Sequence, residues 1–84
     1  MLMRMFAIYD VAVKAYMQPF FMQSEAAAVR AFTDLVNDPT SGVGKHPSDY
    51  TLFELGVYDD TTGKVESSVP RSIGSGVKYL SVKE

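Results

Sequence analysis

The sequence contains no cysteine, no tryptophan and only one histidine among its 84 residues. Disulfide bonds are therefore impossible, and a zinc site is not expected, because such sites are built mainly from cysteine and histidine. A chain this short buries only about 60–65% of its unfolded surface, which leaves a thin margin of stability. Small domains that have neither disulfides nor metals often gain stability by self-association, so we expect a homodimer.

Long apolar runs are also missing. The first ten residues are apolar but are interrupted by Arg4 and Asp10, and no small-residue cleavage site follows, so they do not predict a signal peptide. No stretch approaches the roughly 20 apolar residues that cross a membrane. With 46% hydrophobic residues to build a core, the chain is expected to form one soluble domain over residues 1–84 that stays in the cytoplasm.

A surplus of positive charge is absent too, since eight basic and ten acidic residues leave a net charge of −2. Proteins that bind nucleic acid without sequence preference usually carry a basic surplus, because counterion release from phosphates drives their affinity. The charge therefore counts against nucleic-acid binding unless a local patch, a dimer or aromatic stacking supplies the contacts.

The apolar pattern predicts an α+β fold with one helix on an antiparallel sheet of four to five strands, in the order β-β-α-β-β. Residues 3–11 and 14–22 are predicted strands, and Pro19 places the second at a sheet edge or a bulge. Ser24 suits a helix N-cap, and the apolar spacing from Ala28 predicts a helix that ends near Asn37.

The second half of the chain predicts a strand at residues 50–59 after a polar loop at 40–49. Alternate side chains of this strand divide into two faces. One face holds Thr51, Phe53, Leu55 and Val57, and the other holds Tyr50, Leu52, Glu54 and Tyr58.

A hairpin turn is predicted at residues 59–64, with Gly63 in the left-handed conformation. A short strand from Lys64 to Val69 then ends at Pro70. The tail is expected to form a turn and a strand near residues 77–82, because two glycines at 74 and 76 disfavour a helix.

No segment predicts an enzyme. Residues 41–45 (Ser-Gly-Val-Gly-Lys) lack the spacing of a phosphate-binding loop and follow a helix rather than a strand. His46 is the one candidate general base, but its neighbour Asp49 is of a type that more often caps a backbone amide in such a turn. The acidic pair Asp59 and Asp60 lacks the ligand pattern of a calcium loop. We expect a non-enzymatic protein with no catalytic residue, cofactor or metal.

The aromatic residues are more informative, since tyrosine and phenylalanine make up 12% of the chain. Phe6, Phe32 and Phe53 are predicted core residues. Single-stranded nucleic acid is commonly bound by aromatic faces flanked by lysine or arginine. The candidate contacts are three tyrosines for bases and three cations for phosphates: Tyr16, Tyr50, Tyr58, Lys14, Lys64 and Arg71. These rings also suit a second small core or a dimer interface, and packing of that kind is the commoner use.

Five segments stand in an order that is characteristic of one family. They are residues 6–10 (Phe-Ala-Ile-Tyr-Asp), 19–21 (Pro-Phe-Phe), 31–39 (Ala-Phe-Thr-Asp and then Asn-Asp-Pro), 46–53 (His-Pro-Ser-Asp-Tyr-Thr-Leu-Phe) and 56–64 (Gly-Val-Tyr-Asp-Asp-Thr-Thr-Gly-Lys). With this spacing, residues 3–66 resemble the small nonstructural protein of gokushovirus-type microviruses, phages with single-stranded DNA, which is often labelled a DNA-binding protein.

The resemblance implies a protein that acts in the cytoplasm of an infected bacterium, is absent from the mature virion and is linked to handling the single-stranded genome. It supplies neither a catalytic motif nor DNA-contact residues. Two functions follow. A dimer would bind single-stranded DNA during replication or packaging, with affinity that falls steeply as salt rises. Alternatively, the protein engages a phage or host protein without nucleic acid, which the net negative charge favours.

Overall fold

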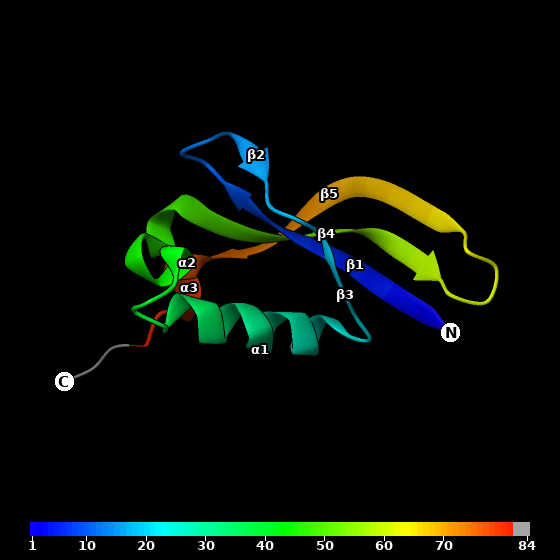
Figure 1. Ribbon diagram of the computed structural model, residues 1–84, viewed down its shortest axis with the longest axis horizontal. Coiled ribbons are helices and arrows are strands. Elements are labelled where there is room, and N and C mark those ends of the chain that lie inside the picture. The colour runs from blue at the N-terminus through cyan, green and yellow to red at the C-terminus, as the bar shows by residue number, and fades with distance from the viewer. Residues whose placement is uncertain (82–84) are drawn as a thin grey trace.

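The computed structural model describes residues 1–81. It confirms the predicted α+β class, because one long helix packs on an antiparallel sheet of five strands (Figure 1). The strands are β1 (Leu2–Asp10), β2 (Ala15–Tyr16), β3 (Phe20–Met22), β4 (Tyr50–Asp59) and β5 (Val65–Ser75). The helices are α1 (Glu25–Val36), α2 (Gly42–Lys45), the 3-10 turn η1 (Pro47–Asp49) and α3 (Gly76–Tyr79). Within residues 1–81, no helix has the length and apolarity to cross a membrane.

Strands β1 and β4 form the middle of the sheet. β4 pairs with β1 on one side and with β5 on the other, and the free side of β1 pairs with β3 near its start and β2 near its end. The predicted strand at 14–22 is thus an outer strand broken in two. Pro19 lies in the break, as its missing N–H predicts, since such a residue cannot continue a ladder.

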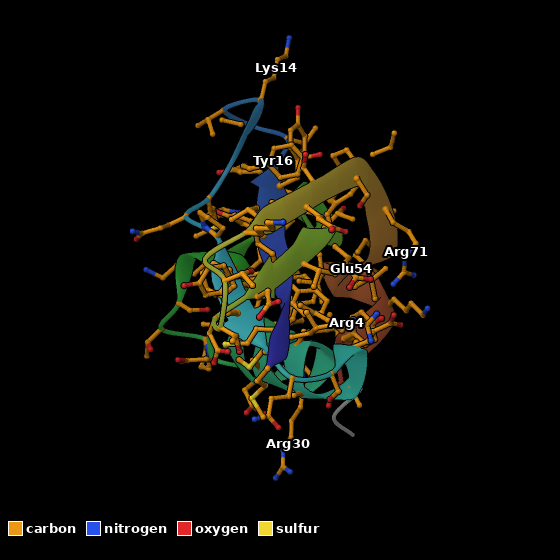
Figure 2. All side chains as sticks on the ribbon, turned by 90° about the vertical axis from the view of Figure 1, so that its right-hand side faces the viewer. Arg4, Lys14, Tyr16, Arg30, Glu54 and Arg71 are labelled. Carbon is orange, nitrogen blue, oxygen red and sulfur yellow. The ribbon has the colours of Figure 1, made fainter. Side chains whose placement is uncertain are left out.

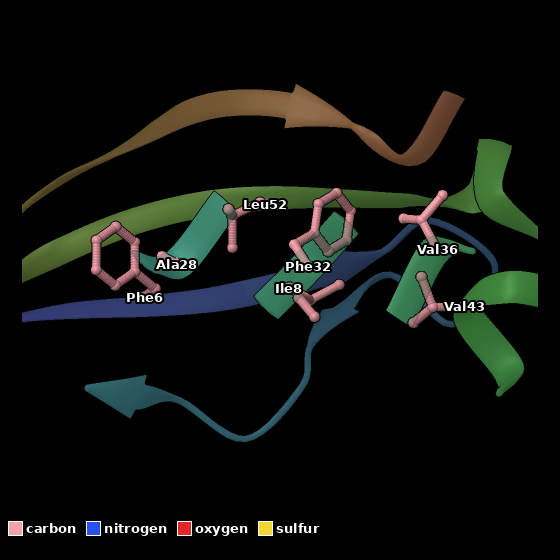
Figure 3. Packing of buried hydrophobic residues seen from close by; sticks show 7 residues of the cluster. All are labelled: Phe6, Ile8, Ala28, Phe32, Val36, Val43 and Leu52. Atoms are coloured by element: carbon pink, nitrogen blue, oxygen red, sulfur yellow. The ribbon is translucent and has the colours of Figure 1, made fainter. Parts of the chain in front are cut away.

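Helix α1 begins and ends where the local sequence predicts. The hydroxyl of Ser24 accepts a hydrogen bond of 3.1 Å from the backbone N–H of Ala27, which satisfies one of the free donors of the first turn. Its buried stripe packs on side chains from the sheet and from α2 (Figure 3). The cluster consists of Phe6, Ile8, Ala28, Phe32, Val36, Val43 and Leu52. Leu35, predicted on the same stripe, is 38% exposed.

The carboxyl-terminal part differs from the prediction. Strand β5 does not end at Pro70 but continues to Ser75. Pro70 is tolerated because β5 is an edge strand and because the ladder between β4 and β5 is irregular at that point. Residues 76–79 form the helical turn α3 instead of a strand, and Val82, the end of that predicted strand, lies outside the described residues.

Gly76 explains the position of α3. A Cβ atom at this residue would lie 2.3 Å from the backbone oxygen of Pro47, so only glycine allows α3 to approach η1 this closely. The predicted loop at 40–49 therefore holds two short helical turns, α2 and η1, against which the end of the chain packs.

Candidate functional site

The sheet has one face that no helix covers within residues 1–81. Residues paired across an antiparallel ladder point to the same side, so the register assigns each paired side chain to a face. Phe6 and Ile8 of β1 and Leu52 of β4 pack against α1. Their neighbours Ala7 and Tyr9 point the opposite way. We call the side opposite α1 the open face (Figure 1).

Five aromatic rings from four strands lie on the open face. They are Tyr9 of β1, Tyr16 of β2, Phe21 of β3, and Phe53 and Tyr58 of β4. The side chains of Tyr16 and Phe21 are 42% and 41% exposed, and the other three rings are half-buried. The open face therefore carries two exposed and three half-buried rings.

The rings form two groups that fix one another's orientation. In the first, the centroid of Tyr16 lies 4.9 Å from that of Tyr9 and 5.5 Å from that of Phe53, both in edge-to-face geometry. In the second, the centroids of Phe21 and Tyr58 are 5.5 Å apart. The rings of the first group pack edge to face, and Phe21 and Tyr58 meet at a tilted angle of 52°.

A bulge in β4 brings Tyr58 to this face. Phe6 pairs with Glu54 but Met5 pairs with Gly56, so Leu55 is an extra residue in β4. Side chains beyond the bulge therefore change sides relative to strict alternation. The prediction that Tyr58 shares a face with Tyr50 is wrong for this reason. The prediction that Phe53 belongs to the core is also wrong, because it lies half-buried on the open face.

The paired positions of the open face carry no charge within residues 1–81. The register places all six charged residues of β1, β4 and β5 on the helix side. These are Arg4, Asp10, Glu54, Asp59, Glu66 and Arg71. The remaining paired positions of the open face hold methionine, alanine, threonine, glycine, valine and serine. The face is therefore aromatic and neutral.

The six predicted contact residues separate into three groups. Tyr16 and Tyr58 lie on the open face. Lys14 is in the turn after β1 and Lys64 in the turn after β4, and since these strands are antiparallel, the two lysines lie at opposite ends of the sheet. The remaining two, Tyr50 and Arg71, belong to the helix side.

Tyr50 packs against the hydrophobic core on the helix side. Its partial burial raises the pKa of the phenol, and the nearby carboxylates of Asp10 and Asp49 raise it further. A ring held in this way is not available to stack on a base.

Arg71 is bound within a network of charged side chains at the start of α1 (Figure 2). Its Nη2 lies 2.6 Å from Glu25 Oε1 and 2.6 Å from Glu54 Oε1. Arg4 binds the same Glu54, with Nε 2.6 Å from Oε2 and Nη2 2.8 Å from Oε1. The hydrogen bond from Arg4, together with the bond from Arg71, lowers the pKa of Glu54 to about 2. Both arginines are therefore neutralised by carboxylates.

His46 lies exposed between α2 and η1. Within the described residues its imidazole has no hydrogen bond to Asp49, and no group of three or more metal-binding side chains is present there. The rings that sequence reasoning did not choose, Tyr9, Phe21 and Phe53, could have been found only from the pairing register, because each belongs to a different strand.

Comparison with known proteins identifies the family. The phage ORF5 protein family matches residues 3–79, so the chain belongs to this family and is a phage protein. No curated protein and no solved structure is significantly similar to it. Phage origin, which the sequence resemblance implied, is thereby confirmed.

Proposed function

We propose that this protein is the nonstructural protein of a gokushovirus-type microvirus, and that it binds single-stranded DNA on its open face without catalysing a reaction. The observation that carries the proposal is the group of five rings on a sheet face without carboxylates. Stacking of a base on an aromatic side chain contributes about 1–3 kcal/mol, and every base can stack. The absence of carboxylates matters because they would repel phosphates.

Lys14 is the cation that we expect to assist, in the turn after β1 at one end of the open face, whereas Lys64 lines a pocket with Val57 and Glu66 on the helix side. Lys14 has a φ of 57°, a left-handed conformation that disfavours side chains other than glycine by about 1–2 kcal/mol. A lysine at a position that suits glycine better supports a use for its charge. Its side chain extends away from the body of the protein, beyond Tyr16 (Figure 2).

The salt dependence of binding should be shallow. One phosphate contact per chain, from Lys14, gives a slope of log K against log salt of about −0.7 for a single strand. The steep dependence expected from the sequence assumed that Arg71 was free, whereas Glu25 and Glu54 hold it. Stacking, rather than charge, would supply most of the affinity.

Fluorescence anisotropy with a labelled oligothymidine at low salt tests this proposal. Replacing Tyr16, Phe21 or Tyr58 by alanine should weaken binding roughly 5- to 150-fold, the equivalent of one lost stack. Absence of binding at micromolar protein would refute the proposal.

A matched pair of charge variants separates the open face from general electrostatic attraction. Lys14→Gly should weaken binding without harming the fold, because glycine suits the backbone there. Arg30→Gln removes one exposed cation from α1, at the opposite end of the protein in Figure 2. Equal losses from both variants would show that the DNA does not lie on the open face.

A protein partner inside the infected bacterium is the second candidate function. The specific observation in its favour is that Lys14, Arg30 and Arg71 point to different sides of the protein (Figure 2), while the net charge is −2. Purification of the protein from infected cells after nuclease treatment would distinguish the two. A phage or host protein that stays bound after nuclease favours this candidate, and a partner lost with the DNA does not.

A further inference from the structure

We infer that, in the absence of DNA, the open face of one chain is covered by the open face of a second copy, so that self-association and DNA binding exclude each other. The competition with DNA rests on the proposed function. The self-association rests only on the composition and size of the face.

The neutral composition of the open face fits a second copy. In a two-fold dimer identical surfaces meet, so a charged residue near the axis would meet the same charge on the partner. The register places every charged residue of β1, β4 and β5 on the other side of the sheet. A face built in this way can meet itself without like-charge repulsion.

The size of the open face also fits. Nine residues of β1 at about 3.4 Å each, across four strand widths of about 4.8 Å, give a flat area of about 600 Å². A standard stable interface buries about 800 Å² per partner, and projecting side chains raise the accessible area above the flat estimate. Two such sheets would pack about 10 Å apart, as in a β-sandwich.

The position of the hydrophobic core gives the energetic reason for self-association. The buried hydrophobic residues number eight in the described part of the chain, and all but Ala7 belong to or pack with the layer between α1 and the sheet. A half-covered sheet leaves Tyr16 and Phe21 more than 40% exposed. Covering them removes apolar surface from water, which is the main favourable term in association.

Sedimentation velocity over a wide range of protein concentration is the first test. The wild-type chain should dimerise, and a Tyr16→Ser, Phe21→Ser double variant should raise the dimer dissociation constant by about tenfold or more. The matched control is Leu35→Ser with Val77→Ser, which changes two comparably exposed side chains of the helix layer. A dimer lost in the control but kept in the open-face variant would place the contact on the helix layer and overturn the inference, as would a wild-type monomer.

A second measurement avoids any loss of packing. Because the chain has no cysteine, one thiol can be introduced at an exposed serine and its alkylation rate followed. Ser72→Cys lies on the open face opposite Phe53, and Ser48→Cys lies in η1. The thiol at 72 should react more slowly as protein concentration rises, while the thiol at 48 should not change. Equal rates at both positions would overturn the inference.

Addition of oligothymidine to the dimer tests the exclusion. The expected species is one chain bound to DNA, and the amount of dimer should fall in proportion to the amount of DNA bound. A dimer that binds DNA and remains intact refutes the exclusion. If no DNA binds but the thiol at 72 is protected, the proposed function fails while the self-association stands.

Discussion

Glu54 is the side chain that links the charged residues on the helix side of the sheet. It lies in the central strand β4 and accepts hydrogen bonds from Arg4 of β1 and Arg71 of β5, while Arg71 also binds Glu25 in the first turn of α1. The substitution Glu54→Gln keeps the size of the side chain but removes its charge. Two guanidinium groups then share only Glu25, and we expect the fold to lose stability at neutral pH.

The magnitude follows from the pKa of Glu54. The fall from its ordinary value of 4.5 to about 2 corresponds to about 3 kcal/mol, since one pKa unit is worth about 1.4 kcal/mol. That figure is an upper limit, because the side chains of Arg4 and Arg71 are 36% and 53% exposed and water screens their charges. We therefore expect Glu54→Gln to cost about 1–2 kcal/mol of unfolding free energy at pH 7.

The pH dependence gives the decisive assay. A carboxyl group with a lowered pKa in the folded state stabilises fully above its unfolded pKa of 4.5, and the contribution disappears as the pH falls towards 2. Urea unfolding of both proteins should show a gap at pH 7 that narrows through this window. The control is Asp34→Asn on α1, an exposed acid without an ion pair in the described residues. Equal stability of Glu54→Gln and wild type at pH 7, or a gap unchanged near pH 2, would refute the reasoning.

Three further substitutions test the packing and the caps by urea unfolding. Phe32→Ala removes the largest side chain of α1 from the core, where it is 0% exposed, and should cost about 3–5 kcal/mol. Gly44→Ala should destabilise by about 1–3 kcal/mol, because its Cβ would collide with the backbone oxygen of Asp38, whereas Gly42→Ala, whose nearest contact is 3.6 Å away, should be tolerated. Ser24→Ala should cost about 1 kcal/mol by removing the N-cap of α1; stability equal to wild type would mean that the cap is not needed.

The elements that sequence reasoning found are those whose cause is local. The Ser24 cap and the apolar residues on one stripe predict helix α1, and these two signals lie within a few turns of each other. The turn between β4 and β5 is equally local, since Gly63 adopts a φ of 75° and its N–H bonds to the oxygen of Asp59. Such features can be predicted because they do not depend on contacts with residues far away in the sequence.

The features that were missed depend on distant contacts. The bulge at Leu55 arises from the way β4 pairs with β1, so it cannot be predicted from the residues of β4 alone. The helical turn α3 exists because Gly76 can approach Pro47, which is 29 positions earlier in the chain. The sequence predicted that Arg71 is a cation available to phosphate, but the fold places it against Glu25 and Glu54. In each case tertiary structure decides what the local sequence leaves open.

The bulge in β4 also determines which side chains belong to the candidate site. If Leu55 were paired regularly instead of forming a bulge, strict alternation would turn Tyr58 towards the helix layer, and the ring pair with Phe21 would not form. Glu54 precedes the bulge and shares a face with Arg4 and Arg71, so the same irregularity separates this carboxylate from Tyr58. A deletion of Leu55 should therefore remove the bulge and leave Glu54 and Tyr58 on opposite faces, because Gly56 then follows Glu54 directly in the same pairing with β1. The division into one neutral aromatic face and one charged, helix-covered face is a consequence of strand register.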